Sequence, residues 1–104
     1  MEGLELVAFE IISNVGMGKS LAIEALREAR QGNYEEAHKK IEEAKEFLVK
    51  GHHSHASLIQ QEAAGERVEI SLMVMHAEDQ LMCAETIKDL AIEIIAMHKD
   101  LSRK

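Results

Sequence analysis

The stretch VEISLMVMHAEDQLMCAETIKDLAIEII, residues 68–95, has apolar residues at helical spacing on two sides of one expected helix. Residues three, four and seven positions apart share a face of an α-helix. The first stripe consists of Val68, Leu72, Met75, Asp79, Met82 and Thr86. The second consists of Ile70, Val74, Ala77, Leu81, Ala84, Ile87, Ala91 and Ile94. One apolar face is enough to cover a core, so the other predicts a further partner for this helix.

Two glycines divide the rest of the chain into helical segments. Gly32 and Gly65 stand where helices commonly end, Asn33 is a candidate N-cap, and the chain has no proline. We predict three helices, at about 4–31, 34–63 and 66–102. Short connections between long helices favour an all-α, antiparallel, up-down-up three-helix bundle. The 104 residues suffice for one core but not two, so residues 1–104 are expected to form a single domain.

The doubly apolar helix also predicts self-association. A chain with only three helices cannot cover both stripes of the last helix with its own residues. The economical solution is that the helix at 66–102 packs against copies of itself.

Composition narrows the class of protein. A net charge of −7 argues against a nucleic-acid binder and is compatible with docking onto a basic partner. The single cysteine, Cys83, excludes an internal disulfide and is consistent with a reducing compartment. We see no basic-then-apolar signal segment and no apolar run near the roughly 20 residues that span a bilayer. We therefore expect a cytoplasmic protein without membrane insertion.

The segment VGMGKS, residues 15–20, has the letters of a phosphate-binding loop but not its spacing. The motif needs a glycine five residues before Gly18, and that position is Ser13. The apolar pattern on both sides is helical, whereas the loop should follow a strand. We interpret the segment as part of a helix and not as a nucleotide site.

Three polar features leave alternatives open. His52, His53 and His55 lie together, and the i, i+3 spacing of His52 and His55 would suit a shared metal or a simple polar patch. Asp79 interrupts an apolar stripe, so its carboxylate is either at a wet edge or is paired or metal-bound. His76, three residues earlier, is either a packed imidazole or a nucleophile able to accept and release a phosphoryl group.

The stretch SLMVMHAEDQLMCAETIKDLA, residues 71–91, resembles a segment of the lactose/cellobiose-type enzyme IIA components of the bacterial phosphoenolpyruvate-dependent sugar phosphotransferase system. Their motif reads close to L-L-x-V-H-A-Q-D-H-L-M followed by T-x-x-D-L-A. The similarity extends to AFEII, to GNYEEAHKKIEEA and to LIQQEAAGERVEISL, and so to nearly the whole chain.

The resemblance implies a homotrimer of three-helix bundles with the third helix at the threefold axis. It implies that His76 accepts a phosphoryl group from the phosphocarrier HPr and passes it to a cysteine of the cognate enzyme IIB, which serves the membrane permease IIC. It also implies that Asp79 points into the trimer centre and helps bind a divalent cation, typically Mg²⁺.

Four positions depart from the family pattern. Gln80 stands where a second histidine is common, and Glu78 and His55 stand where glutamine is usual; Ala56 replaces a threonine. We expect these departures to affect partner choice or hydrogen bonding around the phosphoryl site. The carboxylate of Glu78 would repel a phosphorylated His76 unless it turns away.

The sequence thus predicts a phosphohistidine relay for uptake of a β-linked disaccharide, with cellobiose-like β-glucosides favoured over lactose. Two alternatives stay open. One is a helical adaptor without covalent chemistry, and the other is a metal-binding bundle that uses the histidines of GHHSHAS.

Overall fold

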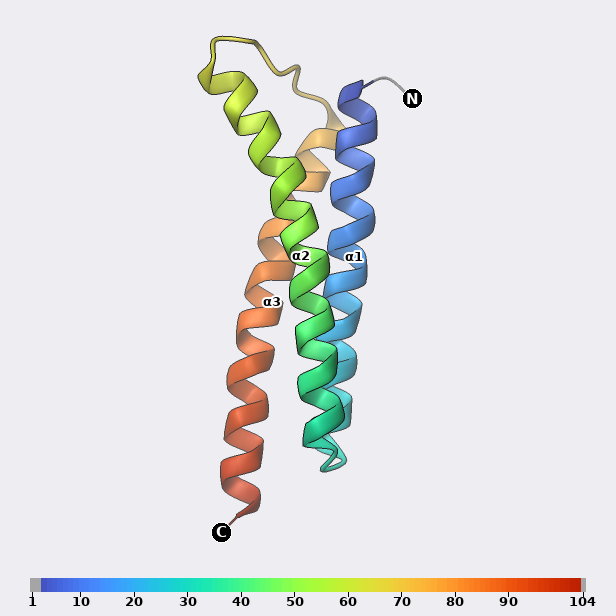
Figure 1. Ribbon diagram of the computed structural model, residues 1–104, viewed down its shortest axis with the longest axis vertical. Coiled ribbons are helices and arrows are strands. Elements are labelled where there is room, and N and C mark those ends of the chain that lie inside the picture. Colours follow the sequence, from blue (N-terminus) through green and yellow to red (C-terminus); the bar gives the residue numbers. More distant parts are fainter. Residues whose placement is uncertain (1–2, 104) are drawn as a thin grey trace.

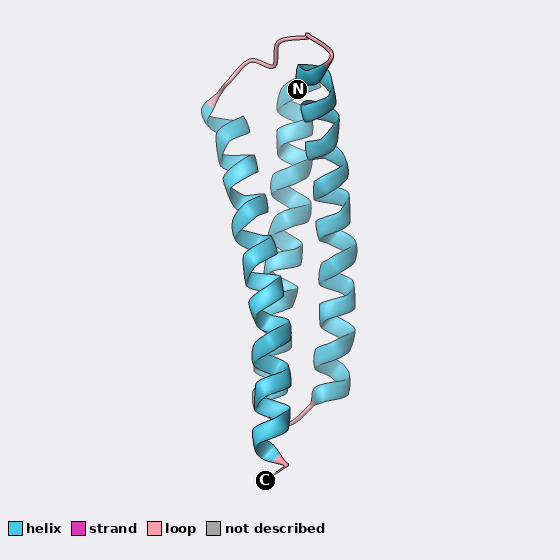
Figure 2. Cartoon of the chain, turned by 90° about the vertical axis from the view of Figure 1, so that its left-hand side faces the viewer, coloured by secondary structure: helices cyan, strands magenta, loops and turns pink. Residues whose placement is uncertain are grey.

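The computed structural model describes residues 3–103 and contains three helices, with no strand in that range. They are α1 (Gly3–Arg30), α2 (Tyr34–Ala63) and α3 (Leu72–Ser102). The helices run up, down and up in an elongated bundle of 56 × 24 × 19 Å (Figure 1). Figure 2 shows the two connections at opposite ends of the bundle. The predicted all-α, antiparallel three-helix fold is confirmed.

Both glycines end helices as predicted. Gly65 has a φ of +86°, its N–H donates to Glu62 O at 3.1 Å, and the N–H of Glu66 donates to Gln61 O at 3.1 Å. This paired arrangement is the Schellman motif, which satisfies carbonyls that a helix end otherwise leaves without partners. Gly32, also at φ +86°, ends α1 in the same way. A side chain at either position would strain the left-handed backbone.

The predicted start of α3 at residue 66 is wrong, because the helix begins at Leu72. Residues 66–71 are not helical, so the second connection is longer than the tight turn we expected. Ser71 fixes the start: its side chain accepts a hydrogen bond from the N–H of Val74 at 3.1 Å. The first connection is tight, but Asn33 makes no capping bond there. Its amide donates instead to Glu28 Oε2 at 3.0 Å.

The helix that packs most extensively against both others is α1, whereas α2 and α3 touch each other least. The buried residues of α2 are Ala37, Ile41, Ala44, Leu48, Gly51 and Leu58. The second stripe forms the core face of α3 from Val74 onward, with Ile95 buried in place of Ile94, whereas Ile70 precedes the helix and is 81 % exposed. The buried residues of that face are Val74, Ala77, Leu81, Ala84, Ala91 and Ile95.

By length and composition α1 could span a bilayer, which our reading of the apolar runs had not anticipated. In the bundle its apolar residues have another use. Its buried residues, among them Ile11, Val15 and Leu21, pack into the core against the other two helices. The composition of α1 is therefore explained by its position between α2 and α3.

The glycines of VGMGKS lie inside α1, as predicted, and differ sharply in surroundings. A Cβ on Gly18 would lie 2.9 Å from Leu48 Cδ2 and 3.2 Å from the carbonyl oxygen of Ala44 on α2. A Cβ on Gly16 would meet nothing within 4 Å. Gly18 thus permits the close approach of α1 to α2, and Gly16 does not.

This difference predicts opposite effects of the same substitution. Gly18→Ala should lower the free energy of unfolding by about 1–3 kcal/mol, because the helices must move apart. Gly16→Ala should raise it by up to about 1 kcal/mol, because alanine favours the helix and meets open space. Urea unfolding followed by circular dichroism measures both. Equal effects at the two positions would contradict the close contact.

Candidate functional site

The surface feature that stands out is a line of large apolar side chains along α3, which we call the exposed stripe. Met75 is 59 % exposed and Met82 51 %, although both are helical and ordinarily core residues. Their positions repeat every three or four residues along almost the whole helix, as in a helix–helix seam. The exposed stripe consists of Leu72, Met75, Asp79, Met82, Thr86, Leu90, Ile94, Met97 and Leu101. The first predicted stripe is confirmed as an exposed face from Leu72 onward, whereas Val68 precedes the helix and packs against the core.

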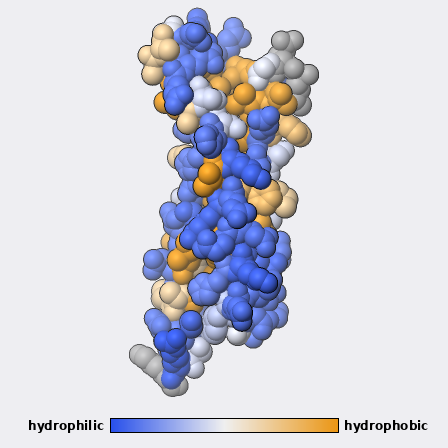
Figure 3. All heavy atoms as spheres, viewed as in Figure 1, coloured by the Kyte–Doolittle hydropathy of each residue, from blue (hydrophilic) through white to orange (hydrophobic). Residues whose placement is uncertain are grey.

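Apolar residues are also concentrated at one end of the bundle. On the face shown in Figure 3, hydrophobic residues gather at the upper end, where α3 begins, and most of the rest is hydrophilic. A groove of about 470 Å³ opens there between α2, the connection and α3. Ile59, Ile70 and Met75 line it, with Glu62 and Glu78 as its acidic groups. The site residues of α3 therefore lie beside an apolar, negatively charged surface.

His76 is the fifth residue of α3, and its side chain is exposed. Asp79, also exposed, follows three residues later, so the two side chains lie on the same side of the helix, about 4.5 Å apart along its axis. Asp79 belongs to the exposed stripe, and His76 lies at its border. An exposed imidazole is accessible to a second protein, and its ring nitrogen can act as a nucleophile toward a group that this protein carries.

The cluster in GHHSHAS does not form a metal site. His52 Nε2 lies 2.8 Å from Glu85 Oε1, and His55 Nδ1 contacts Glu78 Oε2, both across to α3. His53 is exposed. Within residues 3–103 of one chain, no three His, Cys, Asp or Glu side chains are placed to hold a metal ion. The metal-binding alternative therefore has no support in the geometry of these histidines.

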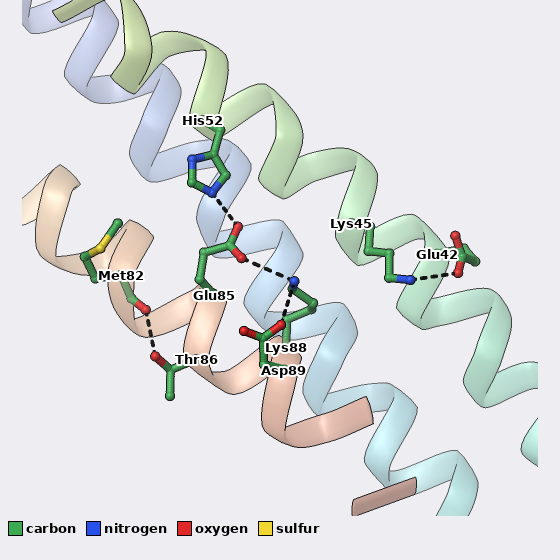
Figure 4. A network of polar contacts seen from close by, with 8 residues as sticks. All are labelled: Glu42, Lys45, His52, Met82, Glu85, Thr86, Lys88 and Asp89. Atoms are coloured by element: carbon green, nitrogen blue, oxygen red, sulfur yellow. Dashed lines mark hydrogen bonds and ion pairs between the residues drawn. The ribbon is translucent and has the colours of Figure 1, made fainter. Parts of the chain in front are cut away.

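A polar network that the sequence reading missed connects α2 and α3 (Figure 4). Glu85 Oε1 lies 2.8 Å from His52 Nε2, and Glu85 Oε2 lies 3.3 Å from the ammonium of Lys88, which is 2.7 Å from Asp89 Oδ1. The hydrogen bond to Asp89 raises the pKa of Lys88 above its usual value; burial opposes this shift, and the hydrogen bond to Glu85 adds to it. The i, i+3 spacing of Glu85 and Lys88 in the sequence could have predicted their ion pair. Nothing in the sequence indicated that Glu85 would contact His52 on α2.

His98, the other histidine of α3, is half-buried and hydrogen-bonded. Its Nδ1 lies 2.7 Å from the hydroxyl of Tyr34, which is also 3.0 Å from Ser102 Oγ. This contact joins the start of α2 to the end of α3, far from His76. Such a role is structural, which leaves His76 as the exposed histidine of α3.

Three comparisons identify the chain. Residues 6–99 match the family model described as "PTS system, Lactose/Cellobiose specific IIA subunit". The lichenan-specific phosphotransferase enzyme IIA component of Bacillus subtilis (strain 168) is 45 % identical over 103 residues, which are 99 % of this chain and 94 % of that protein.

Two solved structures agree with this match over nearly their full length. The crystal structure of the cellobiose-specific enzyme IIA from Bacillus anthracis has a TM-score of 0.97 and 44 % identity, and covers 100 % of this chain and 95 % of that one. The IIA(Chitobiose) chain solved in complex with HPr, from the N,N′-diacetylchitobiose branch of the Escherichia coli phosphotransferase system, has a TM-score of 0.84 and 31 % identity, and covers 98 % and 99 %. The chain therefore belongs to the lactose/cellobiose-specific IIA subunits of the phosphotransferase system and is a phosphotransferase component.

Proposed function

We propose that this chain is a cytoplasmic phosphohistidine relay in which His76 is the covalent carrier. A ring nitrogen of His76 attacks the phosphoryl group held by HPr, so that a P–N bond forms as the bond to the donor breaks. In the second transfer a cysteine of enzyme IIB attacks the same phosphoryl group, so that a P–S bond forms as the P–N bond breaks. The observation that supports this most directly is the exposed imidazole of His76 on a bundle that matches, over its length, a protein solved together with HPr.

The chemistry suits what the site offers. Phosphoryl transfer needs in-line positioning and stabilisation of charge more than covalent machinery in the acceptor. VGMGKS is helical and so does not form a phosphate-binding loop. Partner proteins would supply the charges around the phosphoryl group, while the backbone of α3 would hold the imidazole ring of His76 in position.

The relay would serve uptake of a β-linked sugar, with β-glucosides favoured over lactose. The relatives named for lichenan and for cellobiose support this class. The chain itself contacts no sugar in this scheme, because binding and translocation belong to the membrane permease IIC.

We further infer a homotrimer through the exposed stripe, with Asp79 of each chain at the axis. The apolar residues around Asp79 support self-association, since water penalises an exposed seam of this length. Three converging carboxylates would repel one another, and a divalent cation such as Mg²⁺ would offset the repulsion. The oxygen chemistry of Asp79 fits that cation, and its ligands would come from three chains.

Transfer of labelled phosphoryl groups tests the relay against the adaptor alternative. The wild-type chain is incubated with phosphoenolpyruvate, enzyme I and HPr, and we expect about one acid-labile phosphoryl group per chain. Omission of HPr should abolish the label. A wild-type chain that stays unlabelled with all components present would support the adaptor and refute the relay.

A further inference from the structure

The contact between His55 on α2 and Glu78 on α3 joins two helices that otherwise touch little. Their side chains are 25 % and 31 % exposed, and Nδ1 of His55 is itself sealed from solvent. The two atoms lie within ion-pair distance, but their geometry is not that of a hydrogen bond. A bare ring nitrogen and a carboxylate oxygen would repel, so the contact favours the ring form that carries a hydrogen on Nδ1.

Both residues are departures from the motifs that the rest of the chain resembles. By the resemblance described above, glutamine is expected at the position of His55, in GHHSHASLIQ, and at the position of Glu78, in HAEDQLM. In the sequence these look like two unrelated changes, 23 positions apart. In the fold the two side chains are in contact. We interpret them as one exchange, of two amides for an imidazole and a carboxylate.

The pair lies behind the phosphoryl site. Glu78 follows His76 by two residues, so their side chains point about 200° apart around the helix. His76 therefore faces outward while Glu78 faces α2, and the contact with His55 keeps this carboxylate turned away from the ring that would be phosphorylated. The repulsion that the sequence suggested is thereby avoided.

The turn that holds His76 also has few other attachments to α2. It follows a connection without regular structure, residues 66–71, and stands at the edge of the apolar groove. Val74 and Ala77 pack in the core. Such apolar contacts are not directional, so they hold the turn against the core but restrain its rotation about the helix axis less well. The polar contact of Glu78 with His55 on α2 adds a directional restraint on that turn.

We propose that His55 and Glu78 form a positioning pair for phosphoryl transfer at His76, in place of two glutamines. The pair fixes the rotation of the first turns of α3 and keeps the charge of Glu78 away from the phosphoryl group. This inference rests on the proposed relay. It assigns to the two departures a role in the rate of transfer rather than in docking of HPr.

The test compares His55→Gln, Glu78→Gln and the double variant in the transfer assay with phospho-HPr. Each single change leaves one member without its partner, and we expect kcat to fall roughly tenfold with KM for phospho-HPr nearly unchanged. The double variant, with glutamine at both positions, should return to within about threefold of wild type. Rescue of this kind distinguishes a coupled pair from two independent effects.

His52→Gln is the matched control, because His52 makes the same kind of contact with Glu85 two turns further along α3. We expect its kcat to stay within about twofold of wild type. Thermal unfolding of every variant separates loss of fold from loss of positioning.

The outcomes separate two failures. Unchanged kcat in both single variants, or a double variant no faster than the singles, refutes the positioning pair while wild-type transfer stays intact. A wild-type chain that takes no label refutes the relay itself, and the positioning role with it.

Discussion

Substitution of His76 by alanine should reduce phosphoryl uptake from phospho-HPr by at least about a thousandfold, to background. The methyl group of alanine has no lone pair to attack phosphorus, and no other described histidine of α3 is exposed. Because His76 is exposed, its removal opens no cavity, so the fold should be unaffected. Labelling kinetics measure the loss, and circular dichroism confirms the intact bundle.

His53→Ala is the control for this experiment. His53 is also exposed on a helix and is in the cluster that sequence reading had considered for metal binding. We expect normal label in this variant. Label that persists in His76→Ala and disappears in His53→Ala would move the carrier to α2 and refute the assignment.

The fold was predictable because its signals are local. Apolar spacing marks three helices, and Gly32 and Gly65 end two of them through their left-handed backbone. The start of α3 was missed for a related reason. Val68 and Ile70 continue the spacing of the two stripes, so periodicity alone extends the helix to residue 66. Only Ser71, a good N-cap, pointed to the true beginning at Leu72.

The contacts between helices were not predictable, because the sequence does not state their register. Which residue of α2 meets Glu78 depends on the length of the connection, and we had expected a tight turn there. His55 therefore looked like part of a polar patch. His98 shows the same limit, since its partner Tyr34 lies 64 positions earlier in the chain. His76 and Asp79, by contrast, are exposed on a single helix, and their shared side follows from spacing alone.

Substitution of Met82 by glutamate should convert the proposed trimer to monomers. Met82 is 51 % exposed in the single chain and follows Asp79 by one turn on the exposed stripe. In a trimer through this stripe, three new carboxylates would be buried beside three existing ones, at a cost of several kcal/mol each. Sedimentation equilibrium should give three times the chain mass of 11.6 kDa for wild type and that mass alone for the variant.

Met17→Glu is the matched control, because Met17 is 49 % exposed but lies on α1, away from the stripe. It should remain trimeric.

Sedimentation equilibrium also tests whether a cation stabilises the trimer. EDTA should weaken the wild-type trimer, and Asp79→Asn should make association independent of Mg²⁺, because the repelling charges are gone. A wild-type monomer at all concentrations would refute the stripe as an interface. A trimer indifferent to EDTA and to Asp79→Asn would refute only the cation. The two inferences can therefore fail separately, because the trimer depends on the apolar residues of the exposed stripe and the cation depends on the carboxylate of Asp79.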